Sequence, residues 1–352
     1  MNRVVTHLFP YEKFAFDYIQ KINKLFGRER HSFYIYGKKV ENELEDLEFE
    51  NVIFIDKYSK IKRFFILRRA FMESHKVIIH LLPSSRFLLG TIDCFINKYS
   101  DKFFWNIWGA DLYNSYFRNK KYSVSEIMRR FFIRNVKAVG YIPSDYEFLK
   151  QHYKTNAKFY LASYMYDFFD IESKSDTQVV NVMIANSATK ECQHKEAIDL
   201  LSEYSNLEFK VFCILSYPKS NVEYRDCIID YGREKLGEKF IPVIDYMNYK
   251  QYQDLLSTID IAIFNHNRQQ GLGNIASLLY LGKKVFINPE NGCKDYFERL
   301  GAVVFDINQL NENDLKKDDI EEFKDKNKKC IQDFFSDEQF KKRWELIFED
   351  KY

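Results

Sequence analysis

A short polar loop with two glycines is the part of the chain best suited to chemistry. It runs Arg268-Gln269-Gln270-Gly271-Leu272-Gly273-Asn274, between an apolar strand-like run and a helix-like run. The first amides of a helix lack internal partners and the helix dipole favours anions there, while glycine lets a ligand approach the backbone. Arg268 can add a forked, charge-assisted contact to a diphosphate. The loop therefore predicts an anion site, and a βα turn that merely needs glycine is the alternative.

The same glycines allow a second interpretation. Gly271-x-Gly273-x-x-Ala276 fits the permissive dinucleotide fingerprint, and Glu290 ends the next strand-like run, where a ribose ligand would lie. In that fingerprint the first glycine follows its strand almost directly, whereas here a polar loop intervenes late in the chain. An NAD-dependent oxidoreductase is therefore the weaker interpretation.

Further polar segments follow other strand-like runs in the second half of the chain. Open α/β sheets bind ligands at the carboxyl ends of their strands, so these side chains can meet a phosphorylated ligand, although helix capping is the commoner role for any one of them. The candidate donor-site residues are Asn186, Ser187, Thr189, His194, Tyr217, Asn221, Glu290 and Asn291, with Arg268, Gln269, Gln270, Gly271, Gly273 and Asn274 from the loop.

The first half of the chain offers one carboxylate just after a strand-like run and a glycine. Asp111 could accept a proton from an attacking hydroxyl, and it could equally cap the following helix. His7 and His80 lie near the ends of two other strand-like runs of the same half. Such histidines are more often structural, but both are expected at the sheet edge of Asp111, so they stay candidates for base work.

Other chemistries lack a motif. The chain contains no H-E-x-x-H, Asp-x-Asp, G-x-S-x-G or P-loop, which weakens metal-dependent, hydrolase and kinase interpretations. Its six cysteines form no C-x-x-C pair, as expected for reduced thiols in the cytoplasm. The 53 basic and 51 acidic side chains give a formal net charge of +2, so no global field favours nucleic acid. We expect no metal, no cofactor and no nucleic-acid partner.

Two α/β sheets are needed to position these residues. With 352 residues the chain exceeds a typical single domain, and short β-branched or aromatic runs alternate with helical patterns, as in βαβ units. The polar segment 172–178 predicts a linker between domains 1–171 and 179–335. The expected strands are 4–9, 32–36, 52–55, 77–81, 103–107, 138–141 and 158–161, then 179–185, 209–215, 240–243, 259–264, 284–287 and 302–305.

Two helical segments combine cations with aromatic residues. A helix with a basic face and an apolar face can lie on an anionic membrane, although ordinary surface helices show the same mixture. No uncharged stretch reaches the roughly 18 residues of a membrane span, and no apolar signal segment opens the chain, so contact would be peripheral. The candidate membrane residues are Lys62, Arg63, Phe64 and Phe65 in the first segment, and Arg129, Arg130 and Phe131 in the second.

Taken in order, the motifs resemble one family, the bacterial transferases that move 4-acetamido-4,6-dideoxygalactose (Fuc4NAc) from a TDP carrier to a polyprenyl-diphosphate disaccharide called lipid II. The segment 103–113 meets the family pattern F-F-W-x-I-W-G-A-D-L-Y, and 268–273 meets R-Q-Q-G-x-G. Asn186 and Ser187 with His194 meet its N-S near a histidine, and Ala185 stands where the family tends to carry glycine. Weaker matches are Y-P-x-x-N-x-x-Y from Tyr217 to Tyr224 and N-x-E-N from Asn288 to Asn291.

The resemblance implies a GT-B fold, with two Rossmann-like βαβ domains facing a cleft, and a final helix, 336–352, that returns to the first domain. It implies a metal-independent glycosyltransferase of cell-surface polysaccharide biosynthesis, on the cytoplasmic face of the inner membrane. The donor is then a nucleotide-diphosphate sugar, with TDP favoured, and the acceptor a polyprenyl-diphosphate-linked glycan. Asp111 becomes the leading base candidate, and Trp105, Trp108 and Tyr113 fall on the acceptor side. A non-catalytic scaffold in a polysaccharide-assembly complex is the remaining alternative.

Overall fold

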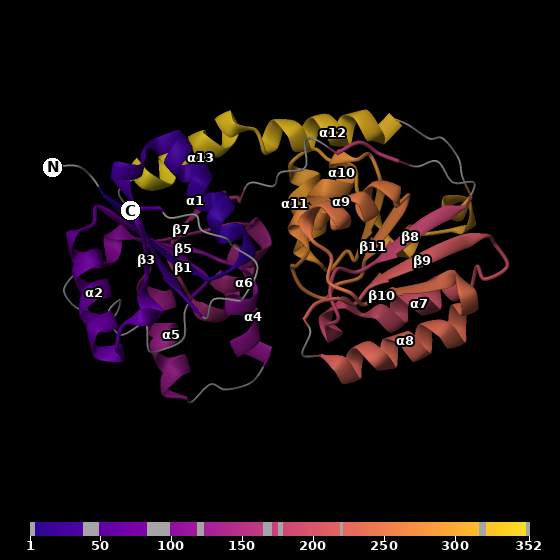
Figure 1. Cartoon of the computed structure of the whole chain (residues 1–352), viewed down its shortest axis with the longest axis horizontal. Helices are drawn as coiled ribbons and strands as arrows, with labels where there is room; N and C mark the ends of the chain where they lie inside the picture. The colour runs from indigo at the N-terminus through magenta and orange to yellow at the C-terminus, as the bar shows by residue number, and fades with distance from the viewer. Residues whose placement is uncertain are drawn as a thin grey trace. The chain divides into compact units, whose positions relative to one another are not determined.

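The chain forms two compact units in a computed structural model that describes residues 4–37, 49–82, 99–117, 123–164, 171–174, 179–218, 221–316 and 322–349 (Figure 1). The first unit comprises Met1–Met165 and Asp337–Tyr352, and the second comprises Tyr166–Ser336. Residues 175–178 of the expected linker lie outside the described residues.

The first unit is built on a seven-stranded parallel sheet in the order β3-β2-β1-β4-β5-β6-β7. Every residue of β1 and β4 is buried, because strands covered on both faces have no solvent side, and this includes the polar residues Thr6, His7, Lys76 and His80. The strands are β1 (Val5–Pro10), β2 (His31–Tyr36), β3 (Val52–Phe54), β4 (Lys76–His80), β5 (Phe103–Asn106), β6 (Ala138–Gly140) and β7 (Lys158–Tyr160).

Helices cover both faces of this sheet (Figure 1). On one face lie α2 (Lys60–Glu73), α5 (Val124–Asn135) and α6 (Pro143–Tyr153), whose apolar residues share a core cluster with the sheet. On the other lie α1 (Lys13–Phe26) and α13 (Asp337–Glu349). The short α4 (Ala110–Phe117) follows β5.

Helix α13 is held to the first unit by buried and charged contacts. Trp344 is fully buried, and its indole Nε1 donates to the carbonyl oxygen of Ser163 at 2.9 Å. Arg30 Nη2 lies 2.8 Å from Glu349 Oε1, and Lys21 pairs with Asp337. The first unit is therefore completed by a segment that follows the whole second unit in sequence.

The second unit contains six parallel strands in the order β10-β9-β8-β11-β12-β13. Figure 1 shows α7 and α8 on one face and α9 to α12 on the other. The strands are β8 (Val180–Ile184), β9 (Phe209–Ile214), β10 (Phe240–Val243), β11 (Ile261–Phe264), β12 (Lys284–Ile287) and β13 (Phe305–Asp306). The helices are α7 (His194–Ser202), α8 (Val222–Leu236), α9 (Tyr249–Thr258), α10 (Leu272–Tyr280), α11 (Gly292–Arg299) and α12 (Glu322–Phe334).

All thirteen expected strands are found, twelve of them with ends within two residues of the expectation. The exception is the last, expected at 302–305 and observed as Phe305–Asp306. The amide of Ala302 donates to Phe297 of α11 and that of Val303 to Asn327 Oδ1 of α12, so helices take the hydrogen bonds that a longer strand would need. The predicted α/β class with two parallel sheets is confirmed.

Candidate functional site

The second sheet reverses its strand order between β8 and β11, and the loop from Arg268 to Asn274 lies at this point. Helix α10 begins after Gly271, whose φ of 74° suits glycine, and no side chain caps the helix start. A Cβ at this position would lie 3.2 Å from Asn186 Oδ1. Glycine is thus required both for the backbone conformation and for the close approach of Asn186.

Gln270 joins the two loops that the sequence singled out. Its amide Nε2 lies 3.2 Å from Asn186 Oδ1, 3.1 Å from Ser187 Oγ and 2.9 Å from Cys192 Sγ. The amide has only two protons for these three acceptors, so it is fully used in holding the loops together. Thr189 takes part in the same hydrogen-bonded cluster, because its Oγ1 lies 3.2 Å from Ser187 Oγ. The structure therefore brings together the candidates after β8 and the candidates after β11.

Several buried polar atoms at this edge have no hydrogen-bond partner among the described residues, or only a weak one. Those without a partner are Arg268 Nε and Gln269 Oε1, while His194 Nε2 and the ring nitrogens of His266 have only weak contacts to the backbones of Ser187 and Gln270. A buried polar atom without a partner costs about 1–3 kcal/mol, so folded proteins rarely leave several together unless a ligand or water completes them. The arrangement is typical of a site that binds a polar ligand.

The two histidines of this edge are neutral at pH 7. Burial lowers the pKa of His194 to about 4, and its Nδ1 lies 3.0 Å from the hydroxyl of Tyr224. Burial lowers the pKa of His266 to about 3, and the nearby His194 lowers it further, while a contact to the Gln270 backbone opposes the shift. The histidines therefore carry no positive charge here, and Arg268, which donates to the Gln269 carbonyl at 3.1 Å, is the cation of the glycine loop.

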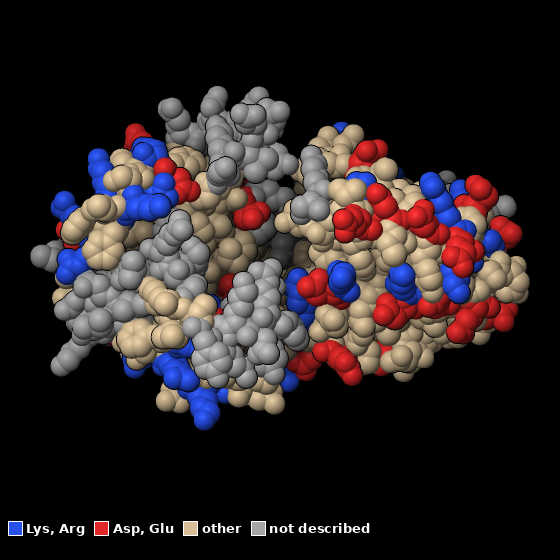
Figure 2. All heavy atoms as spheres, turned by 90° about the horizontal axis from the view of Figure 1, so that it is seen from below, with Lys and Arg blue, Asp and Glu red and all other residues tan. Residues whose placement is uncertain are grey.

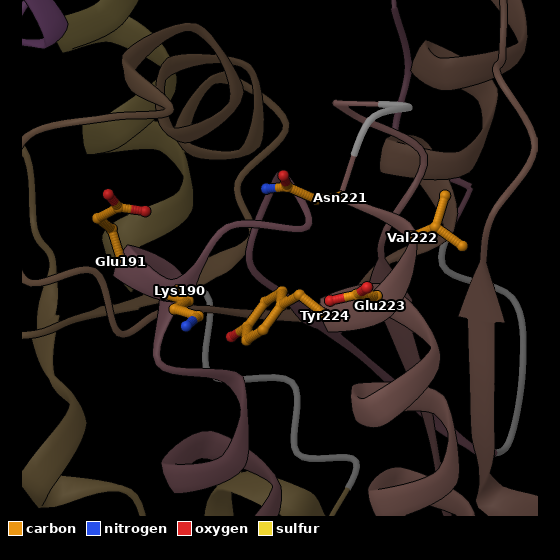
Figure 3. A pocket seen from close by; sticks show the side chains of 6 residues that line it. All are labelled: Lys190, Glu191, Asn221, Val222, Glu223 and Tyr224. Carbon is orange, nitrogen blue, oxygen red and sulfur yellow. The ribbon is translucent and has the colours of Figure 1, made fainter.

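The loop after β9 adjoins the loop after β8. The carbonyl of Tyr217 accepts from the amide of Ala188, and Asn221 Nδ2 donates to the Ala188 carbonyl at 3.0 Å. The ring of Tyr217 is exposed. Beside these loops is an open hollow of about 800 Å³, which Lys190 borders from the turn after β8 and Tyr224 from α8 (Figure 3).

The remaining donor-site candidates have less distinctive surroundings. Asn291 is buried and caps α11, because its Oδ1 accepts from the amide of Cys293 at 2.9 Å. Glu290 is exposed at the end of β12, with its amide bonded to Asn288 Oδ1. Gly273 and Asn274 lie half-exposed in the first turn of α10. In the described ranges, no group of three or more His, Cys, Asp or Glu side chains is arranged to hold a metal ion.

In the first unit, the carboxylate of Asp111 accepts three N–H donors. Its Oδ2 lies 2.7 Å from the amide of Leu82 and 2.8 Å from the indole Nε1 of Trp105, and its Oδ1 lies 3.0 Å from the amide of Trp108. Burial raises the pKa of Asp111, and these hydrogen bonds oppose the rise. Asp111 therefore ties the ends of β4 and β5 to the start of α4, whatever else it does.

The expected acceptor residues have different positions. Trp105 is fully buried in the core, and Tyr113 is buried with its hydroxyl donating to Asp145 Oδ1 at 2.8 Å. Of the three, only Trp108 reaches the surface. Trp105 contributes by holding Asp111 and cannot line a surface, because its whole ring is enclosed by apolar side chains.

The structure places His7 in the middle of β1, away from the sheet edge where the sequence suggested it. His7 is fully buried, with Nδ1 3.2 Å from His80 Nε2 and Nε2 3.0 Å from His31 Nδ1. His80 does end β4, but it too is fully buried, and its Nδ1 lies 2.6 Å from the hydroxyl of Tyr164. Burial lowers the pKa of both His7 and His80 well below the usual value. Their enclosure depends on α13, which local sequence could not indicate.

In the two expected membrane segments, most of the candidate apolar side chains are exposed, and most of the candidate cations form ion pairs with acidic side chains of the same unit. Arg63 pairs with Asp56 and donates to the Tyr58 carbonyl at 2.7 Å. Arg129 is buried against Glu126, and Arg130 lies 2.9 Å from the same carboxylate. Lys62 lies exposed, 4.7 Å from the centre of the Tyr58 ring, while Phe64 is half-buried and Phe65 and Phe131 are exposed.

On the face seen in Figure 2, acidic and basic side chains intermix over the second unit, the right-hand body, and several groups of basic side chains stand among uncharged ones on the first. Among the described residues, no helix is long and apolar enough to cross a membrane.

Sequence reasoning missed three residues of these two edges, Lys190, His266 and Tyr164. His266 stands directly before the glycine loop, so its position was a usable signal. No local sequence signal marked Tyr164 or Lys190, because their roles depend on residues distant in sequence.

Comparison with known proteins places the chain among sugar transferases. A family model described as 4-alpha-L-fucosyltransferase, glycosyl transferase group 56, matches residues 18–350. Among solved structures, a glycosyltransferase from Rickettsia africae has a TM-score of 0.68 at 13% identity and covers 99% of this chain and 98% of its own. Sucrose-phosphate synthase from Thermosynechococcus elongatus has a TM-score of 0.70 at 9% identity, and the match covers 98% of each chain. Anabaena HepE in complex with UDP and glucose has a TM-score of 0.58 at 11% identity, and the match covers 99% of this chain and 95% of its own. These likenesses show the GT-B fold alone.

The buried histidines predict acid sensitivity. Because the folded-state pKa of His7, His31, His80, His194 and His266 lies below the unfolded value of about 6.5, the unfolded chain binds more protons as pH falls. Stability is therefore complete above pH 6.5 and is lost below it, by up to about 1.4 kcal/mol per pH unit for each histidine. Urea unfolding between pH 7 and 4.5 measures this.

Two single variants show which histidines cause the pH dependence of the unfolding free energy. His266→Gln and His194→Gln should each make this dependence shallower than in wild type, because the folded-state pKa of both rings is lowered. A wild-type unfolding free energy that stays flat between pH 6.5 and 5 would contradict the neutral, buried state of these rings.

Proposed function

The chain belongs to glycosyltransferase group 56, the 4-alpha-L-fucosyltransferase family, and from this premise we propose that it transfers Fuc4NAc or a similar deoxy-amino sugar from a TDP donor to a polyprenyl-diphosphate-linked oligosaccharide. The reaction would extend a cell-surface polysaccharide on the cytoplasmic face of the membrane. The observation that carries the proposal is the set of unpartnered buried polar atoms between β8 and β11. Family membership supports sugar transfer and gives the oxidoreductase and scaffold interpretations no support.

The donor diphosphate would bind where α10 begins. The amides of the first turn have no partners within the helix and can bind an anion, and Arg268 Nε adds a charged donor that has no partner in the described parts of the chain. As the bond from the sugar to the diphosphate breaks, negative charge grows on the leaving oxygen, and these preset donors stabilise it without a metal ion. That HepE, of similar fold, binds UDP and glucose supports a nucleotide-sugar donor here.

The nucleoside would extend from α10 along the sheet edge towards β9 and β10. Neighbouring strands are about 4.8 Å apart, so β10 lies about 10 Å from β8, the length of a nucleoside beyond its diphosphate. Exposed rings lie at the ends of these two strands, Tyr217 after β9 and Tyr246 after β10. Aromatic rings of this kind stack on nucleobases.

Asp111 is the proposed base of the acceptor side. A carboxylate offers about four acceptor positions, and three are occupied by N–H donors, which leaves one for the hydroxyl of an acceptor sugar. Burial raises the pKa of Asp111, so it binds a proton more readily than an exposed carboxylate. Trp108, half-buried next to this carboxylate, would contact the sugar.

Membrane contact would use the exposed apolar residues Ile61 and Phe65 of α2 and Val124, Ile127 and Phe131 of α5. Helix α2 follows β3 and so begins at the carboxyl edge of the sheet, and the first turns of α5 lie near Asp111, because Arg129 donates to the backbone carbonyl oxygens of Asp111 and Leu112. A lipid-linked acceptor would reach Asp111 from a membrane touching these turns. Since Arg63, Arg129 and Arg130 are paired internally, binding would be more apolar than electrostatic.

The donor site is tested by Arg268→Ala. Loss of a charged donor to the diphosphate should weaken TDP binding, measured by calorimetry, by about tenfold or more. Arg299→Ala is the matched control, because Arg299 is an exposed arginine of the same unit that pairs with Asp295 on α11. Equal TDP affinity in wild type and Arg268→Ala would refute the assignment, and a wild-type protein that does not bind TDP, UDP or GDP at millimolar concentration would refute the function.

The base is tested by Asp111→Asn. Sugar transfer should fall by at least about a hundredfold, within the range expected for a lost general base, while TDP binding is kept. The substitution also costs one hydrogen bond, so Asp145→Asn controls for stability, since Asp145 is a buried, hydrogen-bonded acidic side chain of the same unit. Transfer at the wild-type rate, or loss of TDP binding, would remove Asp111 from this role.

The membrane surface is tested by flotation with vesicles of phosphatidylethanolamine and phosphatidylglycerol. The Phe65→Ser, Ile127→Ser double variant should lose most binding, and wild-type binding should persist at high salt. Leu346→Ser is the control, because Leu346 is an exposed apolar residue of α13 on the opposite face of the sheet. Binding that disappears with moderate salt, or an unaffected double variant, would contradict this surface.

A further inference from the structure

A chain of hydrogen bonds crosses the first unit from beneath α13 to the sheet edge that holds Asp111. It begins at His31 and continues through His7 and His80 to Tyr164, with atom separations of 3.0, 3.2 and 2.6 Å. From Tyr164 it reaches the indole Nε1 of Trp108 at 2.7 Å. Three of the four links join fully or almost fully buried side chains, so the chain is a fixed part of the unit.

The donors at one end set the direction of every hydrogen bond in this chain. Trp108 Nε1 can only donate, and the amide Nδ2 of Asn106 also donates to the Tyr164 oxygen at 2.7 Å. These two bonds occupy both lone pairs of the hydroxyl, so Tyr164 must donate its own proton to His80 Nδ1. His80 then carries its proton on Nε2 and donates to His7 Nδ1, and His7 donates from Nε2 to His31 Nδ1.

Aromatic side chains of α13 cover the histidines of this hydrogen-bond chain. The Trp344 ring lies 6.0 Å from that of His80, and the Phe348 ring lies 5.8 Å from that of His7 and 4.9 Å from that of His31. With water excluded, an unpaired ring nitrogen would be costly, so the histidines keep the Tyr164 hydroxyl in one orientation.

Trp108 is held at both its backbone and its ring. Its amide donates to Asp111 Oδ1, its indole donates to Tyr164, and the backbone turns at Gly109, with a φ of 78°, directly after it. The indole ring also packs edge-on against the buried ring of Phe9, with 5.7 Å between ring centres. The Tyr164 contact adds a directional hydrogen bond at Nε1, which links the orientation of the indole to the interior of the unit.

Resting on the proposed function, we infer that Tyr164 is a positioning residue of the acceptor side: its hydroxyl fixes the Trp108 indole next to Asp111, and the histidine chain under α13 fixes that hydroxyl. Tyr164 does not itself touch the reacting atoms. It acts on acceptor binding through Trp108, so its removal should affect the acceptor and leave the donor unaffected.

The first test does not depend on activity. The chain contains three tryptophans, so indole ¹⁵N labelling gives three signals, which Trp108→Phe assigns. Tyr164→Phe should shift or broaden the Trp108 signal and leave those of Trp105 and Trp344 in place. Tyr18→Phe is the matched control, since Tyr18 is buried in the same aromatic cluster, 5.5 Å from Tyr164 between ring centres, and its hydroxyl has no hydrogen-bond partner among the described residues. An unmoved Trp108 signal in Tyr164→Phe, or an equal shift in Tyr18→Phe, would overturn the inference.

The second test uses sugar transfer from a TDP-sugar to a polyprenyl-diphosphate disaccharide. Loss of one hydrogen bond should raise the KM for the acceptor by about fivefold to tenfold, with kcat and TDP affinity near wild type. In a Trp108→Phe background, Tyr164→Phe should add no further rise. An added rise of the same size would show that Tyr164 does not act through Trp108. If wild type transfers no sugar, the proposed function fails, and the indole signals still decide whether Tyr164 holds Trp108.

Discussion

Both sheets reverse their strand order beside their first strand, between β1 and β4 in the first unit and between β8 and β11 in the second. At such a point the loops of two adjacent parallel strands leave towards opposite faces, and the sheet edge between them stays open to side chains and ligands. Asp111, which follows β5, bonds to the chain just after β4, beside the first reversal, and Gln270 joins Asn186 at the second. The positions of the candidate groups follow from this order, which right-handed connections between parallel strands enforce.

The two edges differ in how far their buried polar groups are paired. In the first unit, the histidine chain and Tyr164 bond to one another, and Asn106 Oδ1, beside them, has no partner among the described residues. In the second, Arg268 Nε and Gln269 Oε1 both lack a partner among the described residues. Groups that are fixed before a ligand arrives need no reorganisation when charge develops on it, and the folded protein is less stable for leaving them unpaired. The first edge is therefore largely paired within the fold, and the second is the one that we propose a ligand completes.

The central strands could be predicted because they are covered on both faces and so form short, mainly apolar runs between helical patterns. The edge strands β3 and β7 are only partly buried, and their β-branched and aromatic residues were the signal. The glycine loop could be predicted because positive φ and close approach at Gly271 select glycine. The histidine chain could not, because its enclosure needs Trp344 and Phe348 from the far end of the sequence. Asp56 could not be identified as the partner of Arg63, because it lies outside the helix that carries Arg63. Glu126 was a usable signal, because it stands three residues before Arg129 and four before Arg130 on one helix.

Because α13 is the last helix of the chain, the first unit is completed last during protein synthesis. The second unit is one continuous segment, so it can fold as soon as it has left the ribosome, as domains generally do. The first unit is translated earlier but lacks its last helix until all of the second unit has been made. During that interval the ring faces of His7 and His80 have no cover from Trp344 or Phe348, and the nascent chain carries an exposed aromatic surface that a chaperone or the ribosome itself must shield.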